Sequence, residues 1–143
     1  MELTAPIITI AEEVKDLIDA MTLSVAVTPE RVYVRDERMQ TIGNNVCVWV
    51  QPSEFETENI SRAKTKDTYI VDVGIFKKCL TDAEVDEMIN LANEIRTGFE
   101  RHEYASEART LTATWETIFS QEYLIEKNIF ATVITVTIVD LIG

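Results

Sequence analysis

The most regular pattern of apolar and polar positions lies between Asp67 and Leu141. Within it, Tyr69–Ile75 alternates with a period of two, which is typical of a half-buried β-strand. An acidic segment from Thr81 onward repeats its apolar side chains every three or four residues, as a helix does. A threonine-rich extended segment around Trp115 and a β-branched run over Ile129–Val139 follow. This order predicts a small sheet with a helix laid across it.

A first helix is predicted over Ile7–Met21, because its apolar side chains form one stripe. Thr9 and Glu12 suit a capping box, whereas Pro6 suits a first helical turn, so two starting points remain open. A second helix is predicted from Thr81, which is followed three residues later by a glutamate, as in a capping box. The apolar stripe of this second helix consists of Val85, Met88, Ile89, Ala92, Ile95 and Phe99.

Between the two helices the pattern is extended. Leu23–Val34 fits a short hairpin or a bent strand, with a turn at Thr28–Arg31. The polar segment Asp36–Asn45 is predicted to be a loop. Val46–Val50 is apolar on both faces, which favours an interior strand, and we expect Pro52 to end it.

A hairpin is predicted from Phe55–Ala63 and Thr68–Phe76, joined around Lys64–Asp67. The first arm is mostly polar on both faces, whereas the second is apolar on one face, so we expect the hairpin to project beyond the domain body. Basic side chains gather at the expected tip, namely Arg62, Lys64 and Lys66. They either keep an edge strand from pairing with other sheets or dock a partner, and both interpretations remain open.

Two strands are predicted near the C-terminus, over Thr110–Phe119 and Asn128–Leu141, with a helical turn at Glu122–Glu126 between them. The last strand is apolar on both faces, which places it centrally or against a neighbouring subunit. The predicted fold is a single small α+β domain over residues 1–143. It has a mixed or antiparallel β-sheet of about four to six strands, with two main helices packed on one face.

The composition is that of a soluble globular protein: 46% of the 143 residues are hydrophobic and 27% are charged. Residues Met1–Thr4 lack the basic start of a signal peptide, and no run reaches the roughly 18 apolar residues of a membrane span. Cys47 and Cys79 have no metal-binding or redox spacing. We expect buried, reduced thiols and synthesis in a reducing cytoplasm, without membrane association.

The charge is strongly acidic, because 25 acidic residues against 13 basic ones give a formal net charge of −12. Such a surface repels nucleic acid at long range, so we expect no sequence-specific DNA or RNA binding. The excess of acidic side chains either keeps the protein soluble, or it gives a channel a negative lining along which DNA slides without adhering. Trp49 and Trp115 lack flanking basic residues, so we expect them to pack in a core or interface rather than to stack on bases.

Side chains suited to catalysis are few. His102, the one histidine, lies in a charged segment at a helix end, where a solvated side chain or a helix-terminal cation is expected rather than a general base. Nucleotide-binding, P-loop, hydrolase and zinc-protease motifs are absent from the sequence. Glu54, Glu56 and Glu58 would share one strand face, either as a solvated edge or as a cation site. We therefore expect no enzyme, no cofactor and no catalytic residues.

Four segments together carry a likeness to a known family: Ile7–Val14, Val46–Val50 with Pro52, Thr68–Phe76, and Glu122–Val136. Their order resembles that of the tail terminator, or tail completion, proteins of long-tailed bacteriophages, over nearly the whole chain. The resemblance implies a structural virion protein that forms a homohexameric ring. Such a ring caps the completed tail tube, ends its polymerisation and offers a docking surface to the head or neck.

The same resemblance implies the partners: other copies of the chain, the tail tube protein and a head-closure or neck protein. DNA would pass through the lumen without specific binding, and the protein would reside in the virion after synthesis in the host cytoplasm. Two alternatives remain. The chain could be another neck or tail-tube component, such as a head-closure or tube protein, or a small α+β ligand-binding domain.

A closed ring needs two different patches on each subunit that meet around the axis. The basic hairpin tip and the acidic face of the second helix suit such a contact, because their charges are opposite. The candidate interface residues are Arg62, Lys64 and Lys66 at the tip, Glu56 and Glu58 on the arm, and Asp82, Asp86 and Glu87 on the helix.

Overall fold

The computed structural model describes residues 5–32, 46–100, 102–104 and 108–142. Three helices and five strands lie in this part of the chain. They are α1 (Pro6–Ala20), β1 (Pro29–Arg31), β2 (Cys47–Asn59), β3 (Thr65–Lys78), α3 (Asp82–Phe99), β4 (Arg109–Thr114), α4 (Gln121–Lys127) and β5 (Ile129–Ile142).

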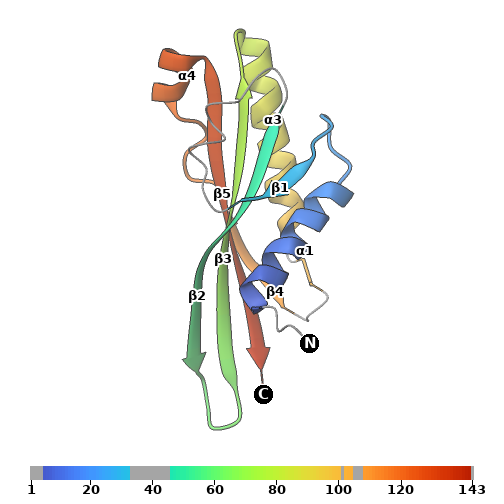
Figure 1. The fold of residues 1–143 in the computed structure, drawn as a ribbon, viewed down its shortest axis with the longest axis vertical. Coiled ribbons are helices and arrows are strands. Elements are labelled where there is room, and N and C mark those ends of the chain that lie inside the picture. The colour runs from blue at the N-terminus through green and yellow to red at the C-terminus, as the bar shows by residue number, and fades with distance from the viewer. Residues whose placement is uncertain (1–4, 33–45, 101, 105–107, 143) are drawn as a thin grey trace.

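The strands form one mixed sheet in the order β1-β2-β3-β5-β4 (Figure 1). β1 runs parallel to β2, and every other neighbouring pair is antiparallel. With three helices packed against this sheet, the chain is a single α+β domain, which confirms the predicted fold class.

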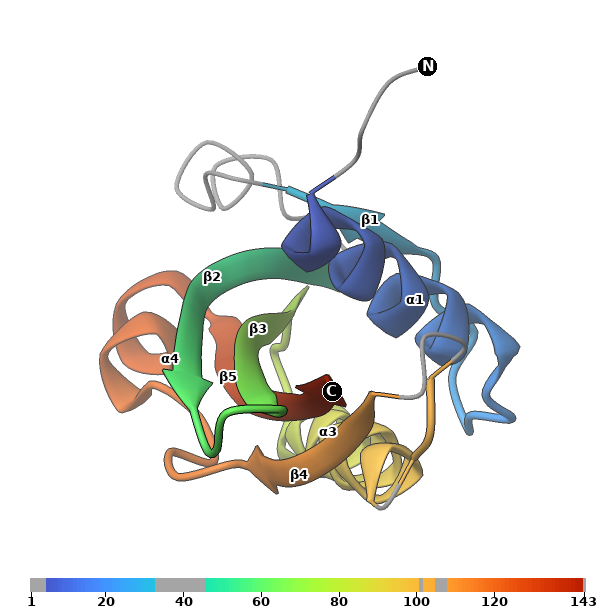
Figure 2. The same cartoon turned by 90° about the horizontal axis from the view of Figure 1, so that it is seen from below.

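The main core lies between one face of the sheet and helices α1 and α3, as Figure 2 shows from below. Alternate residues of the two central strands point into it, as the period-two pattern predicted. The sheet supplies Tyr69, Val71, Val73, Ile75, Phe130, Ile134, Val136 and Ile138. The helices supply Ile10, Ala11, Val14, Ile18, Met88, Leu91, Ala92, Ile95 and Phe99. The prediction of two main helices on one face is therefore confirmed.

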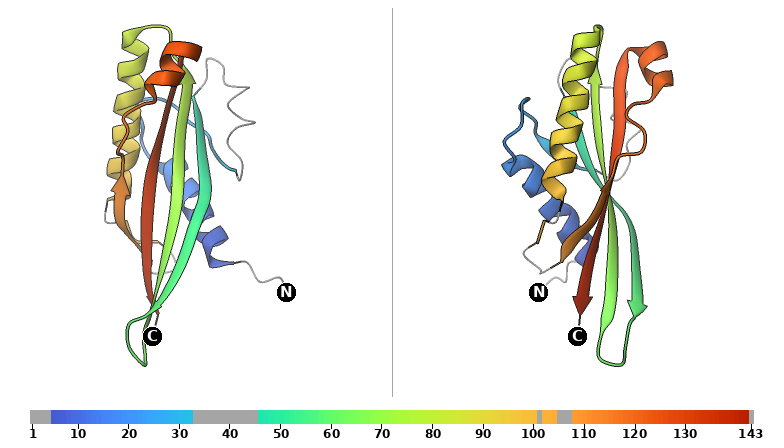
Figure 3. Two further views of the ribbon diagram at one scale, coloured as in Figure 1. Left: turned by 90° about the vertical axis from the view of Figure 1, so that its left-hand side faces the viewer. Right: turned by 180° about the vertical axis from the view of Figure 1, so that it is seen from behind.

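The opposite face of the sheet carries a smaller cluster around Trp49 and Phe76, whose ring centroids lie 4.5 Å apart. Ile129 and Ala131 from β5 complete its centre, and Tyr123 from α4 packs against it. Helix α4 lies on the side of the sheet away from α1 and α3 (Figure 3, right). The expectation that Trp49 packs in a core is thus confirmed.

The helix boundaries settle the alternatives left by the sequence. α1 begins at Pro6, and its N-cap, Ala5, makes no side-chain capping bond, so the capping box over Thr9 and Glu12 is wrong. Proline suits the first helical position, since its missing N–H would have no partner within the helix there. Thr81 caps α3 as predicted, and the turn expected over Glu122–Glu126 is the core of α4. None of these helices is long and apolar enough to cross a membrane.

Two predictions for the first half of the sheet are wrong. Thr28–Arg31 is not a turn, since Pro29–Arg31 forms β1 and pairs with Val48–Val50. Pro52 does not end β2, which continues to Asn59 with an irregularity between Pro52 and Glu54. Because β1 reaches only to Val50, β2 is an outer strand at Pro52, where a missing N–H is tolerated. The loop expected over Asp36–Asn45, together with Tyr33 and Val34, lies outside the described residues.

Two further boundaries differ from prediction. The hairpin turns at Ile60–Lys64 rather than at Lys64–Asp67, because β2 and β3 pair as far as Asn59 and Thr65. The strand expected over Thr110–Phe119 ends at Thr114, and the residues after it bond to β5 through side chains instead. Cys79 is buried as predicted, whereas Cys47 is half-buried, and both are free thiols.

Candidate subunit interface

The β2–β3 hairpin projects past the ends of α1 and β4, so that its tip is one extreme of the molecule (Figures 1 and 3). Along β2, Val48–Val50 is buried, whereas every residue of Ser53–Asn59 is exposed. The projecting hairpin expected from the polar first arm is therefore confirmed. Phe55 illustrates the exposure: it contacts Tyr69, with ring centroids 5.2 Å apart, yet remains 53% exposed.

The hairpin tip, residues Ile60–Lys64, is a fixed turn. The backbone N–H groups of Ile60 and Ser61 donate to the carbonyl oxygen of Lys64, at 3.1 and 3.2 Å. The N–H of Ala63 donates to Ser61 Oγ at 3.3 Å. Arg62 and Lys64 are exposed on this turn, and Ile60 presents an apolar side chain that is 53% exposed. The tip therefore combines one apolar knob with two cations.

Lys66, the third predicted tip residue, lies in β3 rather than in the turn. It is paired in register with Glu58 of β2, and it is half-buried. Thr68 and Ile70 are paired in the same way with Glu56 and Glu54. The three glutamates therefore share one face of the hairpin, as predicted, and all three are exposed. Among the residues that the structure describes, no His, Cys, Asp and Glu side chains gather in a metal-binding group of three or more.

The acidic start of α3 lies at the opposite end of the molecule from the hairpin tip, because β3 runs between them (Figure 1). Asp82, Asp86 and Glu87 are exposed there. Within one subunit, the basic tip and these three carboxylates are therefore far apart. Only a second copy can bring the two predicted patches together.

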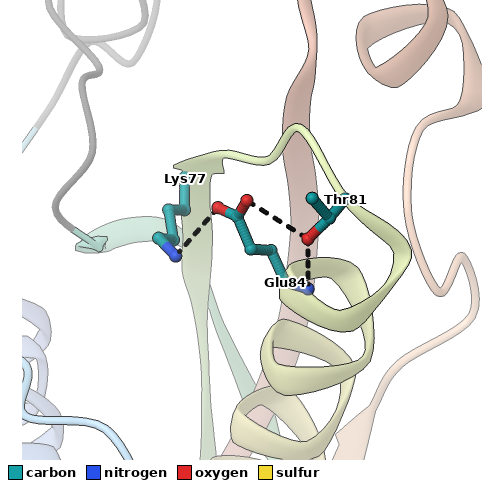
Figure 4. Close-up of polar contacts among 3 residues, drawn as sticks. All are labelled: Lys77, Thr81 and Glu84. Atoms are coloured by element: carbon teal, nitrogen blue, oxygen red, sulfur yellow. Dashed lines mark hydrogen bonds and ion pairs between the residues drawn. The ribbon is translucent and has the colours of Figure 1, made fainter.

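Glu84, in the first turn of α3, bonds to residues of its own chain (Figure 4). Its carboxylate accepts hydrogen bonds from Thr81 Oγ1 at 3.2 Å and from Lys77 Nζ at 3.5 Å, and its N–H donates to Thr81 Oγ1 at 3.3 Å. Desolvation opposes ionisation, but a backbone hydrogen bond at Leu80 and the contacts with Thr81 and Lys77 outweigh it and lower the pKa of Glu84. Glu84 therefore stabilises the helix start through contacts within its own subunit.

The two sides of the sheet differ in how far their edges are covered. Beyond Val50, no other strand of the described part of the chain pairs with the outer edge of β2, so Ser53–Asn59 exposes a row of backbone groups. On the far side, residues 102–104 bond to the start of β4, through Thr110 N–H to the His102 carbonyl oxygen and Tyr104 N–H to the Ala108 carbonyl oxygen. The β4 edge is therefore covered at its start, whereas β2 is unpaired on its outer side over Ser53–Asn59 within the described part of the chain.

A pocket of about 590 Å³, which the sequence did not predict, lies on the sheet face opposite the main core. Its lining includes the apolar groups of Phe76, Ala131 and Val133, together with Tyr123 of α4. Residues of the segment that follows β4 line it as well, among them Glu116, which is exposed.

Partly buried hydrogen bonds hold the segment after β4 against β5 and so shape this pocket. Trp115 Nε1 donates to Thr132 Oγ1 at 2.8 Å, and the same hydroxyl donates to the Thr117 carbonyl oxygen at 2.7 Å. The Ser120 N–H donates to the Ala131 carbonyl oxygen at 2.9 Å. Thr132 is the residue from which this packing could have been predicted, because a threonine in an apolar buried strand needs a hydrogen-bond partner for its hydroxyl.

His102 lies at the C-terminal end of α3, as expected. Its backbone N–H donates to the Phe99 carbonyl oxygen at 3.2 Å, and its ring meets the Tyr104 ring edge-on, with centroids 4.6 Å apart. These contacts place His102 between the end of α3 and the start of β4, and His102 does not line the pocket.

No protein-family model matches the chain, and no curated protein matches its sequence. The likeness to tail terminator proteins therefore rests on the order of the elements and on the residues named above.

Proposed function

We propose that the chain is a structural virion protein whose homohexameric ring caps a phage tail tube, ends its polymerisation and provides the docking surface for the head or neck. The observation that carries this proposal is the projecting β2–β3 hairpin with its fixed basic tip. The element order that resembles tail terminators supports the same assignment. In this role the chain acts through self-association, with no reacting side chain and no cofactor.

The hairpin supports self-association because it exposes groups that isolated proteins usually protect. An open strand edge over Ser53–Asn59 invites pairing with another chain. Three apolar side chains of this region are more than half exposed, namely Phe55 and Ile60 of the hairpin and Leu141 of β5, which pairs with β3. Covering them in a neighbour's surface would gain roughly 25 cal/mol per Å² of buried apolar area.

The two sides of the subunit differ, which favours a ring over a two-fold dimer. A contact between two unlike patches can repeat from subunit to subunit around an axis. The subunits form a closed ring when the rotation between neighbours is a whole fraction of a full turn. The basic tip lies at one end of the subunit and the acidic start of α3 at the other. Opposite charges of this kind set the orientation of neighbouring subunits.

The net charge of −12 fits a ring through which DNA moves. A negative lumen repels the phosphate backbone, so DNA passes without adhering. The two open ends of the ring would then contact the tail tube protein on one side and the head-closure or neck protein on the other.

Sedimentation velocity and negative-stain electron microscopy of the purified protein test the proposal. We expect hexamers at high protein concentration, seen as rings with a central hole, or as single caps when tail tubes are added. A strict monomer under both conditions would contradict the proposal. Labelling of the subunit in assembled particles separates a terminator, which forms one layer, from a tube protein, which forms many.

A further inference from the structure

The pocket on the second sheet face and the hairpin tip are complementary in chemistry. The pocket has apolar groups from Phe76, Ala131 and Val133 and one exposed carboxylate, Glu116. The rest of its lining carries hydroxyl groups, namely Thr114, Thr117, Ser120, Tyr123, Thr132 and Thr135. The tip has one exposed apolar side chain, Ile60, beside two exposed cations. An apolar side chain with flanking cations suits a pocket that combines apolar groups with hydroxyls and one carboxylate.

The tip cannot reach the pocket of its own subunit. Phe76, which lines the pocket, and Thr65, which follows the turn, lie in the same strand, β3. At about 3.3 Å per residue, this stretch of strand spans about 35 Å. β3 is paired on both sides along this whole length, so it cannot fold back on itself. A tip that occupies the pocket must therefore come from another copy of the chain.

We infer that the pocket of one subunit receives the hairpin tip of the next, with Ile60 inserted among Phe76, Ala131 and Val133. Glu116 then faces the cations of the incoming tip, Arg62 and Lys64. This inference rests on the proposed ring and specifies its subunit contact. Each subunit uses its tip on one neighbour and its pocket on the other, so the contact is heterologous, as a ring requires.

This contact differs from the one predicted from sequence, in which the tip meets the acidic start of α3. The carboxylates of Asp82, Asp86 and Glu87 are on the helix that covers the main core, whereas the pocket is on the opposite face of the sheet. The pocket adds a concave site with apolar groups, namely Phe76, Ala131 and Val133, to the carboxylate of Glu116. Burial of an apolar anchor, rather than charge alone, usually decides the affinity of an interface.

Complementary variants test the contact. Ile60→Asp removes the knob while leaving the pocket intact, and Val133→Trp fills the pocket while leaving the tip intact. We expect each variant alone to be monomeric where the unmodified chain forms rings. A 1:1 mixture should give a heterodimer, because the unmodified tip of the Val133→Trp chain can enter the unmodified pocket of the Ile60→Asp chain. Ile125→Asp, on α4 at a position 79% exposed and outside the pocket lining, is the matched control and should form rings.

Charge reversal at exposed positions gives a second readout that does not depend on filling a cavity. We expect Glu116→Lys to raise the assembly midpoint concentration by about tenfold or more, which corresponds to about 1.4 kcal/mol. Adding Arg62→Glu and Lys64→Glu to the same chain should restore assembly. If assembly of the Arg62→Glu and Lys64→Glu chain is restored by lysines at Asp82, Asp86 and Glu87, and not by Glu116→Lys, the tip contacts α3 and the inference is overturned.

The outcomes separate this inference from the proposed function. Rings that persist in both Val133→Trp and Glu116→Lys, or a mixture that stays monomeric, would overturn the tip-in-pocket contact while leaving the ring intact. An unmodified chain that stays monomeric, with or without tail tubes, would overturn both. A small molecule retained in native mass spectrometry, and lost in Val133→Trp while rings persist, would assign the pocket to a ligand and overturn the contact.

Discussion

Gly74 lies under the ring of Phe76, and a Cβ added at Gly74 would come 2.5 Å from Phe76 Cε2. The ring is buried and packs on Trp49, which is paired in register with Gly74 on the neighbouring strand. The absent side chain at Gly74 thus makes room for two aromatic rings on one sheet face. Phe76 also lines the pocket, so this packing links the stability of the fold to the candidate interface.

Gly74→Ala is expected to destabilise the protein, because the added methyl group displaces a ring that Trp49 confines. Overpacking of this kind costs about 1–3 kcal/mol, and the entropy gained by replacing glycine in a strand offsets about 0.5–1 kcal/mol of it. Urea denaturation followed by tryptophan fluorescence measures the loss. An unchanged unfolding midpoint would show that the ring moves freely and that the aromatic pair is loosely packed.

Gly98→Ala is the control for this substitution. A Cβ there would meet the methyl end of Met21, a flexible and half-buried side chain that can move aside. Alanine also favours a helix over glycine by up to about 1 kcal/mol, less near a helix end such as this one. We expect Gly98→Ala to leave the free energy of unfolding unchanged or to raise it slightly, whereas Gly74→Ala lowers it.

The three cations named from the sequence should behave differently, because only two lie in the turn. Lys66→Glu would set two like charges opposite each other in register with Glu58, which costs about 0.2–1 kcal/mol of stability. At a concentration where the protein is monomeric, Arg62→Glu and Lys64→Glu change exposed turn side chains and should leave the thermal midpoint unchanged. Thermal melts at low and high salt check this, since added salt should reduce the Lys66→Glu effect. Equal melting shifts for all three would contradict the register.

Sequence patterns predicted the parts of the fold that depend on local alternation. Tyr69, Val71, Val73 and Ile75 form a buried face because a strand alternates its side chains whatever lies around it. The boundary errors arose where a distant residue decides the outcome. The segment after Thr114 alternates like a strand, but the buried hydroxyl of Thr132 and its neighbours bind it in another conformation.

The candidate site was predictable to a similar extent. The sequence predicted a basic tip, and Arg62 and Lys64 lie there. The turn is at Ile60–Lys64 rather than at Lys64–Asp67, so Lys66 lies in β3 instead. The pocket depends on Phe76, Glu116 and Val133, which come from three separate segments of the chain. No local sequence pattern can predict that these segments lie together, because their proximity depends on the order of the strands in the sheet.

Thr132→Val is expected to destabilise the protein by about 1–3 kcal/mol, since it leaves the Trp115 indole N–H and the Thr117 carbonyl without their partner. The substitution nearly keeps the shape of the side chain, so the loss reports the hydrogen bonds. Thr137→Val, at a half-buried position of the same strand, is the control and should change stability by less than about 0.5 kcal/mol. Denaturant titration measures both. If the two variants lose equal stability, the hydroxyl bridge contributes nothing specific.

Stability should fall in alkaline solution because of two tyrosines. Burial, followed by the charges of Asp67 and Asp140, raises the pKa of Tyr69 to about 12. Burial and the charge of Glu13, partly offset by the hydrogen bond with Thr110, raise the pKa of Tyr104 to about 12. In the unfolded chain a tyrosine ionises near pH 10, so between pH about 10 and 12 the unfolded state loses protons that the folded state keeps.

The stabilising contribution of these two groups is therefore fully present below pH about 10 and is lost as the pH rises toward 12. Urea midpoints measured from neutral pH to the alkaline limit should decline over this window in the unmodified protein. A variant with Tyr69→Phe and Tyr104→Phe should decline less, because it has no phenol at these positions to ionise on unfolding. Tyr104→Phe also removes the 2.8 Å contact with Thr110, so its midpoint at neutral pH should be lower. Identical alkaline slopes in the variant and the unmodified protein would show that both phenols reach solvent.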